Sequence, residues 1–179
     1  MIRSRRLIML LLFSINMTWA GVEDDRLAEA RAKMAEVVGR YQSIVDGADH
    51  SLDAVGLRVL GESLWSTATR DVGGGHPDDR SLYWARIAIR KSLVSNNKDL
   101  KTSALAQFEL ASRGFTSIDF PSTDHKRVLI TGFDPFHLDE EIGQSNPSGL
   151  AALSLDGTKL VTAGGSAWIE AAMMPVRFS

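Results

Sequence analysis

Apolar residues in the first two thirds of the chain recur at steps of three and four, the spacing of one face of an α-helix. Glycines at Gly47, Gly73–Gly75 and Gly114 lie between or after these stretches, where glycine ends helices and forms loops. We interpret the apolar stripes as the core of a small helical unit rather than as the lining of a ligand-binding site. The pattern predicts three or four amphipathic helices, over about 24–45, 51–64, 79–94 and 99–112.

The last third of the chain follows a different pattern. Arg127–Thr131 is a β-branched apolar run without polar alternation, which is typical of a buried parallel strand. Gly132–Phe136 then leaves the carboxyl end of that strand as a loop, and Asn146 and Pro147 begin a helix as its cap and first residue. A second extended segment covers about 167–174. This order predicts an open parallel α/β sheet, in which ligands bind at the carboxyl ends of the strands.

The change of pattern gives a predicted domain organisation. Pro121–Asp124 is polar and turn-forming, which suits a linker. The predicted parts are a signal peptide (1–20), a helical N-terminal extension (21–115), a linker (116–126) and an α/β part that begins a larger domain (127–179).

The first twenty residues have the layout of a secretory signal. Arg3, Arg5 and Arg6 precede the apolar run Leu7–Ile15, and Thr18–Ala20 offers small residues where signal peptidase cleaves. The alternative is an uncleaved membrane anchor, but the run is shorter than the roughly 20 apolar residues that span a bilayer. We therefore expect a periplasmic or secreted protein with no membrane span once the signal is removed.

Composition narrows the function further. The chain has 179 residues, 44% of them hydrophobic and 23% charged, an ordinary globular mixture. Loss of the three signal arginines changes the formal net charge from −2 to −5, which disfavours nucleic acid as a partner. The chain has no cysteine, so it can form no disulfide, thiolate metal site or cysteine nucleophile. His50 and His76 lack a second histidine at ligand spacing, and we predict no metal site and no cofactor.

Four segments in order carry a resemblance to a known family. They are RVLITGFDPF from Arg127, NPS from Asn146, LDG from Leu155 and MPVRF from Met174. Together these roughly 50 of 179 residues resemble the start of the pyrrolidone-carboxylate peptidases (pyroglutamyl peptidase I), cysteine exopeptidases that remove an N-terminal pyroglutamate. The resemblance implies a twisted sheet between helices, a catalytic Glu, Cys and His, and N-terminal pyroglutamyl peptides as substrates.

The resemblance also implies a substrate pocket. Phe133 and Phe136 would line it against the pyrrolidone ring, with Pro135 stiffening the loop between them, while Asp134 and Asn146 tie the loop to the helix start. The alternative for both phenylalanines is packing in the core.

The chain departs from the family in two ways. His137–Glu141 stands where the family has glycines, which alters the pocket rim, and we interpret His137 as a loop residue rather than a base. The family's Glu, Cys and His lie beyond the part matched here. We therefore expect a fragment with no catalytic residues and no turnover.

A second hypothesis remains open at this point. The chain could be a secreted non-enzymatic helical binding or scaffold protein. The helical extension could cover a sheet edge, mediate homo-oligomerisation or contact the envelope, and the sequence does not choose among these.

Overall fold

The computed structural model describes residues 22–49, 51–121 and 126–176. The predicted signal peptide, His50 and most of the Pro121–Asp124 turn lie outside these described residues. Within these described residues, six helices precede the sheet: α1 (Val22–Lys33), α2 (Ala35–Gly39), α3 (Gln42–Asp46), α4 (Ala54–Gly73), α5 (Arg80–Asn96) and α6 (Thr102–Ala111). The remaining elements are β1 (Lys126–Phe133), α7 (Pro147–Leu155), β2 (Thr158–Thr162) and β3 (Gly165–Met174), so the predicted mixed α/β class is confirmed. A pyroglutamyl-peptidase-like fold is not shown.

The helices follow the predicted pattern with three main differences, one of which is that the second helix continues to Gly73, nine residues beyond its predicted end. The first predicted helix is three short ones, because the backbone leaves the helical region at Met34 and Tyr41. The Tyr41 hydroxyl donates to Asp71 at 3.0 Å, which fixes this bend against α4. The second helix starts at Ala54 rather than near Ser51, because the Asp53 carboxylate accepts from the backbone N–H groups of the first turn.

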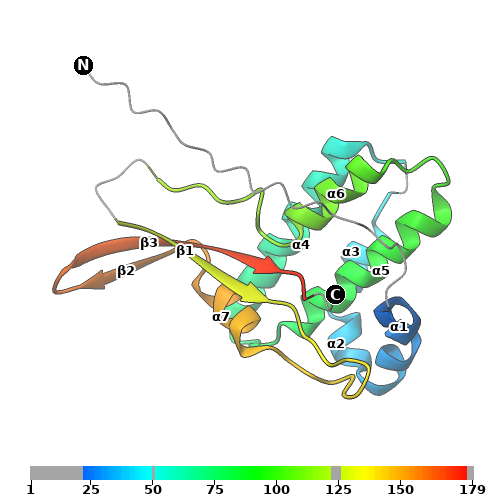
Figure 1. The fold of residues 1–179 in the computed structure, drawn as a ribbon, viewed down its shortest axis with the longest axis horizontal. Coiled ribbons are helices and arrows are strands. Elements are labelled where there is room, and N and C mark those ends of the chain that lie inside the picture. The colour runs from blue at the N-terminus through cyan, green and yellow to red at the C-terminus, as the bar shows by residue number, and fades with distance from the viewer. Residues whose placement is uncertain (1–21, 50, 122–125, 177–179) are drawn as a thin grey trace.

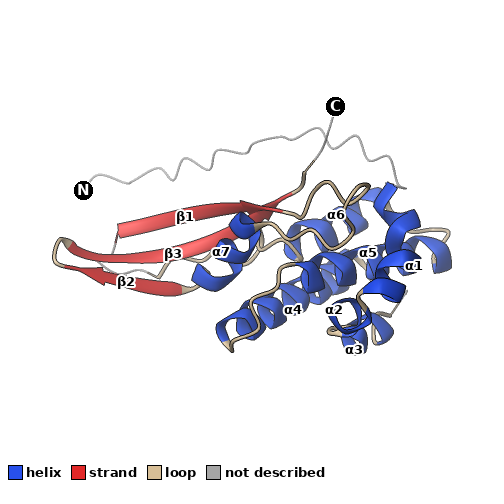
Figure 2. Ribbon diagram, turned by 90° about the horizontal axis from the view of Figure 1, so that it is seen from below, coloured by secondary structure: helices blue, strands red, loops and turns tan. Residues whose placement is uncertain are grey.

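In the part of the chain that the structure describes, the sheet has three strands in the order β1-β3-β2, with β3 in the centre. β1 and β3 run parallel, with Lys126 opposite Ala167 and Phe133 opposite Met174. β2, which the sequence pattern did not predict, pairs antiparallel with β3 as a hairpin. The sheet is therefore mixed, and the prediction of a purely parallel sheet is wrong. Helix α7 packs on one face of β1 and β3 and also contacts α4, and the other helices lie toward the carboxyl ends of the two parallel strands (Figures 1 and 2).

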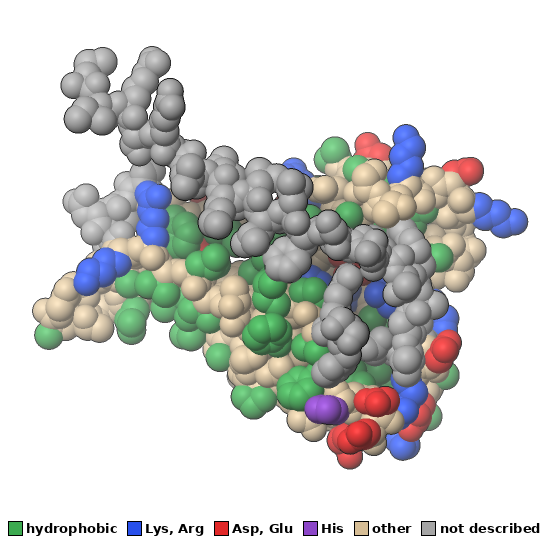
Figure 3. All heavy atoms as spheres, viewed as in Figure 1, with side chains coloured by type: hydrophobic (Ala, Val, Ile, Leu, Met, Phe, Trp, Pro, Cys, Tyr) green, Lys and Arg blue, Asp and Glu red, His purple; other side chains and the backbone are tan. Residues whose placement is uncertain are grey.

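Strand β1 is more exposed than its sequence predicts. Its first four residues are exposed, and the Leu129 side chain is 52% accessible. β1 is at the edge of the sheet, so among the described residues only β3 pairs with it. In the view of Figure 3, hydrophobic side chains gather over the sheet and α7, whereas charged side chains gather over the helices.

One core joins the helices to the α/β part. The larger cluster of buried residues combines side chains of α4, α5 and α6 with Leu153 of α7 and Met173 of β3. The Trp65 indole donates to Asp156 at 2.9 Å, and the backbone N–H of Met173 donates to the carbonyl of Arg113 at 2.8 Å. The helices thus support the end of β3, next to the loop that follows β1. The boundary predicted at 116–126 stays a prediction.

Candidate functional site

A pocket of about 400 Å³ lies at the carboxyl end of β1, where the parallel strand pair ends. Open α/β sheets bind ligands at this position, and pockets of this volume are common ligand sites. The pocket is formed by the end of β1, the following loop, the first turn of α7 and the segment after β3. Its lining residues are Phe133, Phe136, His137, Asn146, Ser148 and Val176.

Both phenylalanines predicted to line a pocket lie at this one. Phe133 is the last residue of β1 and its side chain is 47% exposed, while Phe136 is half-buried in the loop. The Phe136 and His137 rings are 4.9 Å apart and tilted by 54°. His137 has a φ of 59°, a conformation that non-glycine residues rarely adopt, and it lies in the loop as predicted. That the two phenylalanines bind a ligand stays a prediction.

The polar groups of the pocket are largely satisfied by one another. The Ser148 hydroxyl accepts from the backbone N–H of Phe133 at 3.1 Å and donates to the Asn146 Oδ1 at 2.8 Å. That oxygen also accepts from the backbone N–H of Ser148, and the Asn146 Nδ2 donates to the carbonyl of Asp134 at 3.0 Å. A ligand in this pocket would therefore meet mostly apolar surface.

Beneath the loop, Asp134 forms a buried ion-pair cluster with two arginines. Its Oδ1 accepts from the Arg86 Nη2 at 2.6 Å, and its Oδ2 accepts from the Arg113 Nη1. Burial raises the pKa of the Asp134 carboxyl, but Arg113 and Arg86 outweigh it and the pKa lies below its usual value. Asp134 is ionised and held from two sides. The predicted tie between loop and helix start is made by the Asp134 carbonyl and Asn146, and the two arginines are further partners that the sequence did not identify.

Arg86 is an unusual member of this cluster. Its side chain is 1% exposed, and its Nε and Nη1 have no hydrogen-bond partner among the described residues. Glu109 is the second acid nearby, with its Oε2 at 4.0 Å from the Arg86 Nε and 3.6 Å from the Arg113 Nη2. Burial lowers the pKa of Arg86, and the neighbouring Arg113 lowers it further. Without the Asp134 carboxylate, the buried Arg86 guanidinium would keep only the more distant Glu109 of these two acids.

A second buried acid holds the start of α7. Asp79 precedes α5, and its carboxylate accepts from the Ser145 hydroxyl at 2.7 Å and from the backbone N–H of Asn146 at 2.9 Å. Burial raises the pKa of Asp79 above its usual value. Asn146 caps α7 as predicted, because its side chain accepts from the backbone N–H of Ser148.

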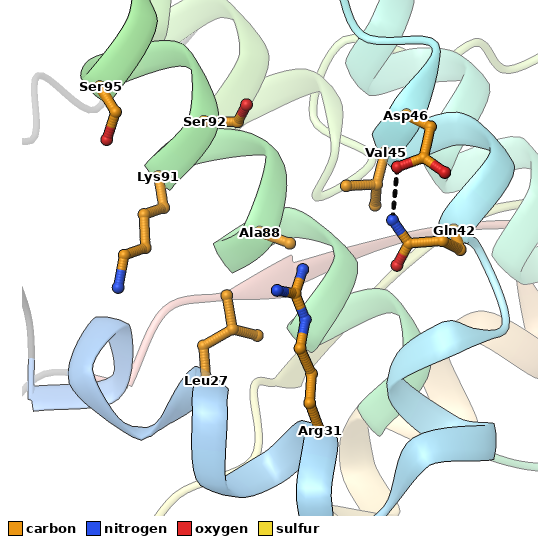
Figure 4. Close-up of a pocket in the computed structure, with 9 residues that line it drawn as sticks. All are labelled: Leu27, Arg31, Gln42, Val45, Asp46, Ala88, Lys91, Ser92 and Ser95. Carbon is orange, nitrogen blue, oxygen red and sulfur yellow. Dashed lines mark hydrogen bonds between the residues drawn. The ribbon is translucent and has the colours of Figure 1, made fainter.

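A second hollow of about 390 Å³ lies between α1, α3 and α5 (Figure 4). Arg31 and Lys91 lie on two of its sides, and the Gln42 amide donates to Asp46 at 2.6 Å across a third. Its charged residues are exposed to solvent, which weakens their interactions. We therefore regard the pocket at the end of β1 as the candidate site.

Sequence reasoning missed Asp79, Arg86 and Arg113. All three lie in the helical part, where the pattern was assigned to core packing. The sequence signal at Arg86 is its position between the apolar residues Leu82–Ala85 and Ile87–Ile89, but the sequence does not show that residues 81–89 are all buried. A charge among apolar positions of a helix is expensive unless it is paired.

Comparison with known proteins gives two similarities. Residues 127–179 match the family described as PA0049, C-terminal domain. The chain is also 34% identical over 146 residues to an uncharacterized protein, PA0049, of Pseudomonas aeruginosa, which covers 66% of this chain. The chain spans about a quarter (26%) of the length of that curated relative. No solved structure matches the chain.

These findings correct the resemblance drawn from the sequence. The segments from Arg127 to Phe178 match the PA0049 C-terminal domain, and nothing points to the pyrrolidone-carboxylate peptidases. The expectation of a peptidase, of a thiol protease and of pyroglutamyl peptides as substrates is therefore wrong. The alternative of a non-enzymatic helical scaffold has no support from the comparisons either. Short blocks such as TGFDPF describe a tight strand-to-loop turn, which unrelated α/β proteins also need.

Among the described residues, no helix is long and apolar enough to cross a membrane. The predicted export signal lies in residues 1–20, which the structure does not describe.

Proposed function

We propose that this chain binds a small, ring-sized apolar ligand in the pocket at the carboxyl end of β1. The observation that carries the proposal is the combination of two aromatic side chains and Val176 around a pocket of about 400 Å³. Its amide and hydroxyl groups are already hydrogen-bonded to each other, so binding is driven by burial of apolar surface. Flat rings suit this site because aromatic pairs gain energy beyond simple burial.

A titration with indole tests the proposal. We expect backbone amide shifts in an NMR spectrum at Phe136, His137 and Ser148, with a Kd of about 1 mM, or about −4 kcal/mol. The substitution Phe136→Ala weakens binding about two- to tenfold, because an aromatic contact is worth about 0.5–1.5 kcal/mol.

Val161→Ala is the matched control, since Val161 is a 70% exposed apolar residue on β2 and does not line the pocket. Its Kd for indole should equal that of the wild type. Equal affinities for the Phe136→Ala and Val161→Ala proteins, or shifts centred on β2, would show that indole merely coats exposed apolar surface.

We also propose that the protein is exported by a signal peptide cleaved after Ala20. The three arginines followed by an apolar run support this proposal. Amino-terminal sequencing of protein from a periplasmic extract should begin at Gly21, and a sequence beginning at Met1 in a membrane fraction would overturn the proposal.

A further inference from the structure

The loop after β1 is long and is held at both ends through one residue. Residues 134–146 connect β1 to α7 and contain no helix or strand. At its start, the backbone N–H of Asp134 donates to the carbonyl of Met174 at 3.0 Å. At its end, the Asn146 side chain donates to the carbonyl of Asp134. The position of Asp134 therefore determines both where the loop leaves β1 and where it reaches the start of α7.

Asp134 also lies between the two aromatic residues of the pocket. Phe133 precedes it and Phe136 follows two residues later, with Pro135 fixing the backbone between them. A displacement or rotation at Asp134 is thus passed directly to both rings.

Two distant arginines hold this residue. Arg86 comes from the middle of α5, 48 residues away, and Arg113 from the turn just after α6, 21 residues away. Each takes a different oxygen of the carboxylate, so the pair fixes the plane of the carboxylate as well as its position. A single partner would fix the distance alone.

We propose that Arg86 and Arg113 are positioning residues for the pocket. They hold the Asp134 carboxylate in one orientation and thereby set the relation of Phe133 to Phe136. This inference rests on the proposed binding function and deepens it, because it makes α5 and α6 part of the binding site. Both arginines lie outside residues 127–179, the part that matches the PA0049 C-terminal domain.

The alternative is a purely stabilising role, in which loss of the ion pairs lowers stability without changing the pocket. The test compares two variants. Asp134→Asn removes the charge but keeps the size of the side chain. Leu57→Ala removes a fully buried core side chain of α4 that does not line the pocket, which matches the destabilisation without touching the loop.

Indole titration by NMR at 10 °C, on variants whose dispersed amide signals first show that they are folded, separates the two roles. We expect Asp134→Asn to weaken indole binding about tenfold, and Leu57→Ala to leave the Kd unchanged. Arg113→Lys, which keeps the charge but loses the planar fork, should give an intermediate Kd. A folded Asp134→Asn or Arg113→Lys protein with the wild-type Kd would overturn the inference.

A ligand-free measurement keeps this inference distinct from the proposed function. In the absence of indole, nuclear Overhauser contacts and shifts of the Phe133 and Phe136 rings report their arrangement directly. We expect Asp134→Asn and Arg113→Lys to change these ring shifts and contacts. Leu57→Ala should leave them as in the wild type. If the wild type binds no indole, the proposed function fails, and these ring signals alone decide whether the arginines position the loop. Ring signals that stay unchanged in all three variants would overturn the inference.

Discussion

Helix α5 and strand β1 carry apolar residues at similar density, yet their environments differ sharply. Residues 81–89 of α5 are all buried, because α1, α2, α3 and α4 pack around this helix. The first four residues of β1 are exposed, and among the described residues β1 has one neighbouring strand, β3, and one covering helix, α7. The comparison shows that the burial of an element depends on which other elements pack against it. Its own apolar content determines only whether that burial is favourable.

The same comparison explains where the polar chemistry lies. The buried helix α5 carries the charge of Arg86, which is paired through its Nη2 with Asp134 in the loop after β1. Buried charges are tolerated when they are paired, and their loss is costly. The exposed side holds single apolar residues such as Leu129 and Val161, whose loss should cost little. Substitutions in α5 and its buried cluster should therefore lower the free energy of unfolding more than substitutions on the exposed strands.

The largest effect should come from Asp134→Ala. It leaves Arg86 buried without its 2.6 Å partner, and loss of one member of a buried ion pair costs about 3–5 kcal/mol. Urea unfolding measures the change. Asp139→Ala, in the exposed part of the same loop, should change the free energy of unfolding by less than about 0.5 kcal/mol. Similar values for the two variants would show that the cluster does not stabilise the fold.

The next prediction compares the loss of stability when one leucine of α5 and one leucine of β1 are each replaced by alanine. Leu93→Ala in α5 removes a fully buried side chain and should cost about 2–5 kcal/mol. Leu129→Ala in β1 removes a half-exposed side chain and should cost less than about 1 kcal/mol. Thermal and urea unfolding of both proteins check this. A large loss for Leu129→Ala would show that β1 is covered in solution.

Gly132→Ala tests the one covered part of β1. A Cβ at Gly132 would overlap the backbone oxygen of Ser148, so α7 must move away from the strand. Overpacking of this kind costs about 1–3 kcal/mol. Gly164→Ala is the control, because a Cβ there would meet its nearest atom, in Thr162, at 3.8 Å. Equal stability of the two variants would mean that α7 does not press on β1.

The smallest effect concerns pH. The pKa of Asp134 is lower in the folded protein than in the unfolded chain, so the folded state favours the ionised form. Its contribution is fully present above the unfolded pKa of about 3.9 and is lost as the pH falls through the lowered pKa. The stability advantage of the wild type over Asp134→Asn should be constant from pH 7 to 5 and should shrink below about pH 4. Urea unfolding across this range checks the sign, and an advantage that grows at acid pH would contradict it.

Much of the local structure could be predicted from the sequence. Helical spacing located α4, α5 and α6, and the Asn146-Pro147 pair marked the start of α7, because these signals depend on neighbouring residues alone. The exposed edge of β1 could not be predicted, since an apolar run carries no information about how many strands lie beside it. Strand β2 was missed because Thr158–Thr162 is only five residues long and mostly exposed, which leaves no clear apolar alternation to indicate a strand.

The candidate site divides in the same way. Phe133 and Phe136 could be placed together because they flank one short turn at a strand end. Arg86 and Arg113 could not, because their partner Asp134 is far away in sequence and pairing over such distances is set by the packing of whole helices. The family resemblance failed for a related reason. A short motif specifies a local backbone shape, whereas an activity requires groups from several parts of a chain.

The most direct measurement is an isotope-filtered NMR spectrum of the wild-type protein with indole, which detects nuclear Overhauser contacts between ligand and protein. We expect contacts from the indole protons to the rings of Phe133 and Phe136 and to the methyl groups of Val176. Contacts to Leu129, Leu160 or Val161 instead, or none at saturating indole, would contradict a binding pocket at the end of β1.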